Sequence, residues 1–192
     1  MKGTRMKRKE FKHLFLLCLL LFYAAPVPAH PHVFITPEVR MIKEGDVLKE
    51  VKVRWVFDRM TSISMLEYLD KNRDGLPDEN MVKKISREVF PALSIYGYYT
   101  FISIDGGENM EINPKNFIIK IEEGETVIYE FEIPVGQKMN TKVSVYFEDE
   151  EIYTAFDFYP GNFYVTDESG GKAEFGINEK ESAHSNIVEA VF

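Results

Sequence analysis

The sequence predicts a mainly β protein of the α+β class, an antiparallel, immunoglobulin-like β-sandwich with one inserted helix–loop–helix. Apolar and polar residues alternate over most of the chain, which is typical of half-buried strands. The alternation changes to a helical period at about residues 59–95, and turn residues separate the other segments at short intervals. With 45% hydrophobic and 28% charged residues in 192, the composition indicates one globular domain and excludes a disordered or multi-span membrane protein.

Residues 1–29 have the pattern of a cleavable export signal. A basic start is followed by the apolar run Leu14–Ala25, and small residues at Val27 and Ala29 form the cleavage pattern. The apolar run is shorter than the roughly 20 residues that span a bilayer. We therefore expect cleavage after Ala29 and a periplasmic location. Cys18, the only cysteine, leaves with this signal, so we expect neither a disulfide nor a disulfide-linked partner.

The charge of the chain favours cations as ligands. Its formal net charge is −8, although the first 29 residues hold six basic residues and one acidic residue. Without these residues the chain carries 17 basic and 30 acidic residues. Because a surface this acidic repels phosphate backbones, nucleic acid is excluded as a partner.

Two strands joined by a turn open the predicted domain, which we place at residues 30–166. Residues 33–42 form the first alternating segment, and Gly45 marks the turn. Residues 47–57 form the second segment, whose apolar residues are expected on one face. These apolar residues are Val47, Val51, Val53, Trp55 and Phe57.

Helical patterns follow at residues 61–69 and 81–90, joined by a polar loop. We expect Pro91 near the end of the second helix or at a kink. From residue 98 the chain returns to alternating segments, while residues 167–192 form either a C-terminal tail or a final edge element. The further predicted strands are 98–104, 116–121, 126–133, 142–147, 152–158 and 163–165, with turns between them that include residues 134–136.

The mature N-terminus, His30-Pro31-His32, is the first candidate metal site. Cleavage would free the α-amine of His30, which can chelate a metal together with its own imidazole, and His32 adds a second ring. Neutral imidazole suits nickel, cobalt, zinc and copper. Pro31 has no amide hydrogen, so the planar mode that binds metal through deprotonated amides is blocked. Asp58 is a further candidate ligand, and the alternative is that it caps the helix that follows.

The loop between the two helices resembles the calcium loop of an EF-hand, with Gly75 at position 6. The candidate oxygen ligands are Asp70, Asn72, Asp74, the carbonyl of Leu76, and Asp78. The loop is degenerate because Met81 stands at position 12, where a bidentate glutamate is expected. Bound calcium would be structural and would hold the two helices together. The alternative is a polar turn without metal.

Three of these features together resemble a bacterial family of unknown function that is described as the periplasmic component of an ABC-type transport system. They are the acidic loop and the segments Ala29-His-Pro-His-Val-Phe-Ile35 and Val53-Arg-Trp-Val-Phe-Asp58. The likeness extends from about Ala29 to Phe163. The resemblance implies periplasmic handling of nickel, cobalt or zinc, with an inner-membrane metal transporter or permease as partner, and it implies no catalytic residues.

We therefore expect a non-enzymatic periplasmic accessory that binds a divalent transition metal or delivers it to an inner-membrane permease. The alternative is a calcium-stabilised extracytoplasmic module that recognises a protein partner. A third hypothesis, a copper enzyme with a histidine brace, requires His184 to lie near His30. The sequence contains no G-x-S-x-G, H-E-x-x-H or P-loop pattern.

Overall fold

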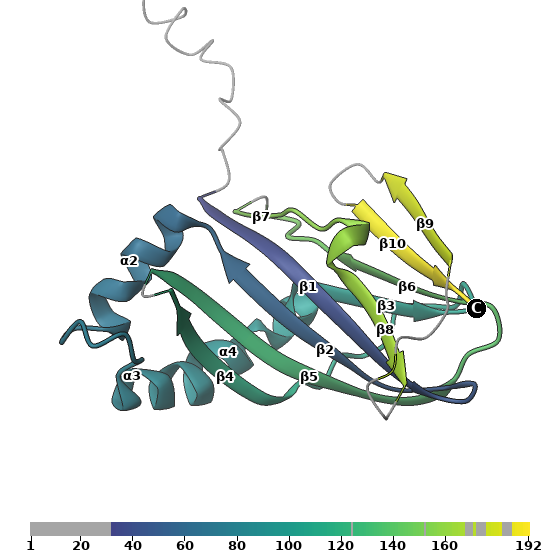
Figure 1. The fold of residues 1–192 in the computed structure, drawn as a ribbon, viewed down its shortest axis with the longest axis horizontal. Helices are drawn as coiled ribbons and strands as arrows, with labels where there is room; N and C mark the ends of the chain where they lie inside the picture. The colour runs from purple at the N-terminus through teal and green to yellow at the C-terminus, as the bar shows by residue number, and fades with distance from the viewer. Residues whose placement is uncertain (1–31, 124, 152, 168–170, 172–175, 182–185) are drawn as a thin grey trace, which may run out of the picture. The chain divides into compact units, whose positions relative to one another are not determined.

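The computed structural model describes residues 32–123, 125–151, 153–167, 171, 176–181 and 186–192, which form two β-sheets and a helical insert (Figure 1). Within these residues the first sheet has six strands in the order β4-β5-β2-β1-β7, with β8 also paired to β1. Its strands are β1 (Val33–Glu44), β2 (Val47–Phe57), β4 (Lys115–Glu122), β5 (Thr126–Lys138), β7 (Thr154–Phe156) and β8 (Phe163–Asp167). The mainly β, α+β class is confirmed.

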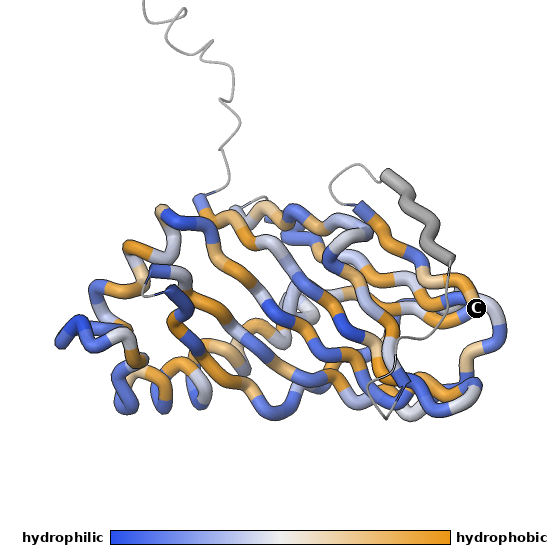
Figure 2. Tube along the Cα trace, in the orientation of Figure 1, coloured by the Kyte–Doolittle hydropathy of each residue, from blue (hydrophilic) through white to orange (hydrophobic). Residues whose placement is uncertain are grey.

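The first two strands, β1 and β2, form the antiparallel hairpin that the sequence predicted. Gly45 adopts a φ of 58° in the turn, a left-handed conformation that glycine reaches without a Cβ clash. Figure 2 shows apolar and polar residues alternating along both strands. One expected core position is wrong, because Leu48 is fully buried while Val47 is only half-buried. The cause is a register shift at Lys49, which leaves one extra residue on β2 relative to β1.

Strand β1 also pairs in parallel with two later strands, and this corrects the purely antiparallel expectation. β7 pairs with the start of β1, where Ile35 lies opposite Phe156. β8 pairs with the second half of β1, where Val39 lies opposite Phe163. Alternation along a strand indicates which residues face the core, but it carries no information on the direction of the neighbouring strand. The strand order does not establish the immunoglobulin-like topology either.

Strand β5 continues through residues 134–136, where the sequence predicted a turn. It extends to Lys138 and pairs with β2 on both sides of those residues. The chain accommodates Pro134 and Gly136 through the same register shift that displaces Leu48. The turn signal therefore marks a bulge in a long strand rather than the end of that strand.

The second sheet has the order β3-β6-β10-β9 in the part of the chain that is described. Its strands are β3 (Thr100–Ile104), β6 (Lys142–Phe147), β9 (Gly176–Glu181) and β10 (Asn186–Val191). β10 lies inside this sheet, between β6 and β9, and its residues Val188 and Ala190 are fully buried. The second sheet therefore includes part of residues 167–192, for which we expected either a tail or a final edge element, and β9 is the strand at its edge.

The predicted helix–loop–helix is present between β2 and β3. Its first helix is α2 (Arg59–Leu69), and the loop of residues 70–78 leads to α3 (Glu79–Lys84). The second helical pattern does not form one regular helix. It continues as a π-helical turn η1 (Ile85–Val89), the short α4 (Phe90–Ala92) and the 3-10 segment η2 (Leu93–Tyr99). Pro91 cannot donate a backbone hydrogen bond and its ring clashes with the preceding turn, which accounts for the widened turn just before it.

Both sheets and the helical insert share one hydrophobic core. Trp55 of β2 is only 2% exposed, and its ring lies 5.1 Å from that of Phe131 and 6.5 Å from that of Phe90, which belongs to α4. Between the sheets, the rings of Phe147 and Phe156 lie 5.8 Å apart. The second sheet therefore covers one part of the inner face of the first sheet, and the helical insert covers another (Figure 1).

Several expectations fall on residues outside the described ranges. These are the export signal and its cleavage after Ala29, the candidate ligand His30, and His184. In the ranges that are described, no helix is long and apolar enough to cross a lipid bilayer.

Replacing Phe131 by alanine is expected to destabilise the protein by about 3–5 kcal/mol, because it removes a fully buried ring that packs against Trp55. Chemical denaturation followed by the fluorescence of Trp55, the only tryptophan, measures the change. Ile118→Ala, at an exposed position of the neighbouring β4, is the control and is expected to change stability by no more than about 0.5 kcal/mol. Equal effects of the two substitutions would contradict the central place of Phe131.

Candidate functional site at the start of β1

His32 stands immediately before β1, and its side chain is exposed to solvent. Its backbone amide donates to the carbonyl of Tyr153 over 2.9 Å, and the two rings lie 5.1 Å apart. Because Tyr153 immediately precedes β7, the parallel pairing of β1 with β7 determines where His32 leaves the sheet. The imidazole is therefore held at a defined place and stays accessible to a metal ion.

Asp58 follows β2 and caps α2, as the alternative interpretation of the sequence predicted. Its Oδ1 accepts hydrogen bonds from the amides of Met60 at 2.8 Å and Thr61 at 3.2 Å. Its Oδ2 accepts from the amide of Phe34 at 3.3 Å and from the hydroxyl of Thr61. Burial alone raises the pKa of Asp58, but these hydrogen bonds outweigh burial and lower the pKa below its ordinary value.

The same contacts place Asp58 beside the start of β1. Its own amide donates to the carbonyl of Phe34 over 3.0 Å, and Phe34 is two residues from His32. The fold therefore brings two of the candidate transition-metal ligands into one region. A carboxylate has about four acceptor positions, so the hydrogen bonds of the cap do not by themselves prevent metal ligation. A ligand role for Asp58 stays a prediction.

A run of four acidic residues, Glu148–Glu151, lies between β6 and β7 in the same region. Asp149 is buried, and its carboxylate accepts hydrogen bonds from the amides of Glu151 at 3.0 Å and Thr154 at 2.9 Å. These bonds hold the acidic loop against the start of β7. The other three acids of the run line a hollow of about 290 Å³, and none of them forms an ion pair with a described residue.

Within the described ranges, no group of three or more His, Cys, Asp or Glu side chains is arranged to hold a metal ion. His30 lies outside these ranges, so the proposed combination of His30, His32 and Asp58 stays a prediction. The copper-enzyme hypothesis also stays a prediction, because it depends on His30 and His184, which both lie outside the described residues.

The calcium-like loop is organised by Asp70, which is 9% exposed. Its two carboxylate oxygens accept the amides of Asp74 at 2.9 Å and Gly75 at 3.0 Å. Gly75 has a φ of 78°, so the residue at loop position 6 adopts a conformation that favours glycine. Asp70 thus determines the backbone path at positions 5 and 6 of the loop.

Further polar groups of this loop bond to one another. The side-chain amide of Asn72 donates to Asp74 Oδ2 over 2.8 Å, and the Leu76 amide donates to Asp74 Oδ1 over 2.8 Å. Asp78 caps α3 by accepting the amide of Met81 over 2.9 Å. The candidate ligands therefore form a compact polar loop, and its binding of calcium stays a prediction.

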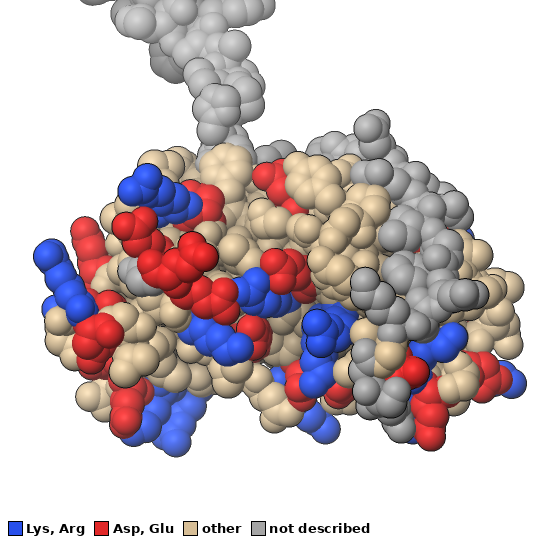
Figure 3. All heavy atoms as spheres, viewed as in Figure 1, with Lys and Arg blue, Asp and Glu red and all other residues tan. Residues whose placement is uncertain are grey.

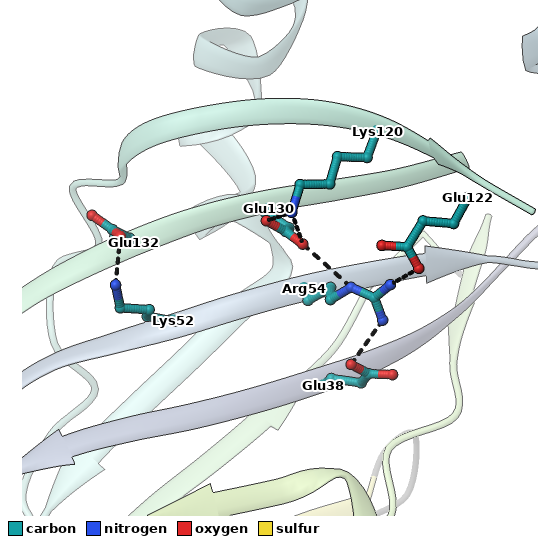
Figure 4. Close-up of polar contacts among 7 residues, drawn as sticks. All are labelled: Glu38, Lys52, Arg54, Lys120, Glu122, Glu130 and Glu132. Carbon is teal, nitrogen blue, oxygen red and sulfur yellow. Dashed lines mark hydrogen bonds and ion pairs between the residues drawn. The ribbon is translucent and has the colours of Figure 1, made fainter. Parts of the chain in front are cut away.

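A charged network that the sequence did not predict covers the outer face of the first sheet (Figure 4). Arg54 of β2 lies at its centre and contacts acids on three other strands. Its Nη1 lies 2.9 Å from Glu38 Oε2, its Nε lies 3.3 Å from Glu130 Oε1, and its Nη2 pairs with Glu122. The alternation of lysine and arginine along β2 was visible in the sequence, but the strand order that supplies the acids was not.

Lys52 extends this network, because its Nζ lies 2.7 Å from Glu132 Oε1. The hydrogen bond from Lys52 is the main reason that the pKa of Glu132 is lowered. Figure 3 shows acidic and basic side chains interleaved over this face of the molecule. Since these charges satisfy one another, the outer face is better explained as a surface that supports the sheet than as a binding site.

The fold and the site together define a class of protein: a mixed β-sheet domain with a helical insert, in which an exposed histidine stands directly before the first strand, beside an acidic loop. A family model with the description "Protein of unknown function (DUF1007)" matches residues 15–177, and the chain therefore belongs to this family. A comparison with curated proteins found no match. Membership of an uncharacterised family, as the resemblance implied, is confirmed.

Asp58→Ala is expected to lower the stability of the protein by about 1 kcal/mol at neutral pH, because α2 loses its cap. The pKa of Asp58 is lowered in the folded state, so its contribution is present above the ordinary value of 3.8 and is lost as the pH falls through the folded value. The difference between the two proteins is therefore expected to shrink below about pH 4. Urea unfolding between pH 7 and pH 3 measures this difference.

Asp58→Asn is the matched variant for this prediction. Asparagine caps helices about as well as aspartate but does not titrate. We expect it to retain most of the stability at pH 7 and to show a weaker pH dependence than the wild-type protein. A difference between Asp58→Ala and wild type that stays constant down to pH 3 would show that the charge of Asp58 has no role in the cap.

Proposed function

We propose that the protein is a non-enzymatic periplasmic accessory that binds a divalent transition metal and delivers it to an inner-membrane permease. The observation that carries this proposal is the exposed His32 at the start of β1, positioned by Tyr153. Nickel, cobalt and zinc are the metals that we favour, and copper fits the same ligands. The family resemblance to a transport component supports the delivery role.

The ligand set suits transfer better than permanent storage. The α-amine and imidazole of His30 and the imidazole of His32 supply three nitrogen ligands from three consecutive residues. A metal that prefers four ligands would then keep one position for Asp58 or for a ligand from the permease, which could displace Asp58 during transfer. Because Pro31 blocks binding through backbone amides, the metal would be held by groups that release it readily.

The acidic loop supports the proposal through electrostatics. Val33 lies opposite Thr154 in the β1–β7 pair, so the run Glu148–Glu151 is brought near the start of β1 by backbone pairing. Carboxylates without basic partners raise the local concentration of cations. A metal ion approaching His32 therefore meets a favourable potential.

Addition of one glycine before His30 is expected to lower zinc or nickel affinity at least about tenfold, because the α-amine no longer chelates together with the imidazole of that residue. Isothermal titration of the mature, tag-free protein against the extended protein measures the loss. His32→Gln is expected to weaken binding as well, and His184→Gln is the control that should leave it unchanged. Equal affinities of the extended and mature proteins would refute the terminal chelate.

A second candidate function is a calcium-stabilised interaction module. The observation that favours it is the loop between α2 and α3, where Asp70 holds positions 5 and 6 and Gly75 has the positive φ expected at position 6. The missing ligand is the bidentate glutamate at position 12. Calcium would then stabilise the helical insert rather than change its conformation.

Met81→Glu is expected to increase calcium affinity on the order of tenfold, because it restores a charged ligand at position 12. The rise in melting temperature with millimolar calcium measures this gain. Met81 packs partly against the core, so Met81→Gln controls for the lost packing and should show no gain. If calcium shifts the melting temperature of neither the wild-type protein nor Met81→Glu, the loop is a turn without metal.

A further inference from the structure

The hollow beside the acidic loop has two walls of different chemistry. One wall is aromatic and consists of Tyr96, Tyr99 and Phe101. The other wall is acidic and consists of Glu148, Glu150 and Glu151. The hollow measures about 290 Å³, and none of the described residues that line it is a lysine or arginine. We call it the tyrosine hollow.

The aromatic wall is built as a stack. The rings of Tyr96 and Tyr99 lie 5.4 Å apart and within 14° of parallel. Tyr99 is supported from behind by Trp55 at 6.4 Å and Phe156 at 5.8 Å, which anchors it in the core. Tyr96 is 39% exposed, so part of its ring is available for contact with another molecule.

An unusual backbone produces this stack. Gly97, Tyr98 and Tyr99 have φ values of 58°, 53° and 49°, which is a left-handed turn that two tyrosines adopt at a steric cost. The backbone carbonyl of Tyr99 accepts the amide of Glu148 over 3.2 Å. This hydrogen bond ties the aromatic wall directly to the acidic wall.

The acidic wall differs from the acids of the outer face. Acids around Arg54 are paired with basic side chains, whereas Glu148, Glu150 and Glu151 form no ion pair with any residue in the described ranges. Burial is the main cause that raises the pKa of Tyr99 to about 12, and the charge of Asp149 adds to it. The hollow therefore combines an unbalanced negative potential with aromatic ring surface.

We propose that the tyrosine hollow receives an arginine side chain of a partner protein, with the guanidinium stacked on Tyr96 and paired with Glu150 or Glu151. A bare metal ion would use the carboxylates but would leave the aromatic wall without a function. A guanidinium uses both, because it is planar, stacks on aromatic rings and forms bidentate pairs with carboxylates.

Two further observations favour a protein side chain as the occupant. The volume of the hollow lies at the small end of ligand sites, which usually range from about 300 to 1,000 Å³, so it suits one side chain better than a larger molecule. Ile95 lies on its rim and is 78% exposed, which offers an apolar contact to residues that flank the arginine. This inference does not depend on metal binding, because it uses neither His30 nor His32.

The test is a titration of the untagged product of the full-length chain, in the presence of a chelator, with the capped tripeptide Gly-Arg-Gly. Nuclear magnetic resonance follows the backbone amides of Gly97 and Glu150. We expect the chemical shifts of these amides to change saturably at millimolar concentrations of the arginine peptide. The matched tripeptide, in which neutral citrulline replaces arginine, is expected to bind about tenfold more weakly. Equal binding of the arginine and citrulline peptides, or no saturable shift with either, would overturn the proposal.

Variants separate the two walls of the hollow. The double substitution Glu150→Gln and Glu151→Gln is expected to lower the affinity for the arginine peptide about tenfold. Its control is Glu108→Gln and Glu111→Gln, which makes the same change of charge at exposed positions in the loop after β3. Tyr96→Leu is expected to remove the preference for the arginine peptide over a lysine peptide, since stacking favours the planar group.

Three outcomes of these comparisons count against the proposal. If the two double variants bind the arginine peptide equally, the acidic wall has no role. If the wild-type protein binds lysine and arginine peptides equally, the assignment to a guanidinium is wrong. If spermidine binds more tightly than the arginine peptide, the occupant is a free polyamine and not a protein side chain. Unchanged thermal unfolding of each variant confirms that the fold is retained.

Discussion

The position of the candidate site depends on β1 being hydrogen-bonded along both of its edges. On one side it pairs with β2, and on the other it pairs first with β7 and then with β8. Its inward-facing residues Val39 and Met41 are fully buried. A strand constrained in this way cannot shift its register by one residue without exposing these side chains. The backbone position of His32, directly before this strand, is therefore well defined even though the side chain is exposed.

Charge is used in two different ways on the molecule. On the outer face of the first sheet, Arg54 and Lys52 neutralise the acids of neighbouring strands, which lets four strands with charged residues lie side by side. In the loop Glu148–Glu151 the carboxylate of Asp149 accepts backbone amides, whereas its three acidic neighbours form no ion pair with a described residue. The remaining acids of that loop line the tyrosine hollow. This contrast separates a surface that maintains the fold from one that is available to a ligand.

Local patterns in the sequence were sufficient for much of the fold. The alternation of β2 and of β6 predicted both strands with their observed bounds, and the capping role of Asp58 followed from its place before a helical pattern. The failures required non-local information. The direction of β7 and β8 depends on strand pairing, which alternation does not encode, and the same holds for the place of residues 167–192, which the sequence left open.

For the candidate site, the residue types were visible in the sequence, but their arrangement was not. Only the β1–β7 pair brings His32 toward the acidic loop, and only the left-handed turn at Tyr98 and Tyr99 creates the aromatic wall. The sequence predicted a strand through those tyrosines because their type is common in strands.

The parallel pairing of β1 also bears on the order of folding. The Thr166 hydroxyl bonds to the Met41 carbonyl 125 residues earlier in the chain, so the first strand gains its last neighbour only after most of the protein has been synthesised. Contacts between residues so far apart in the sequence slow folding, so the pairing of β1 with β8 is expected to complete the first sheet late.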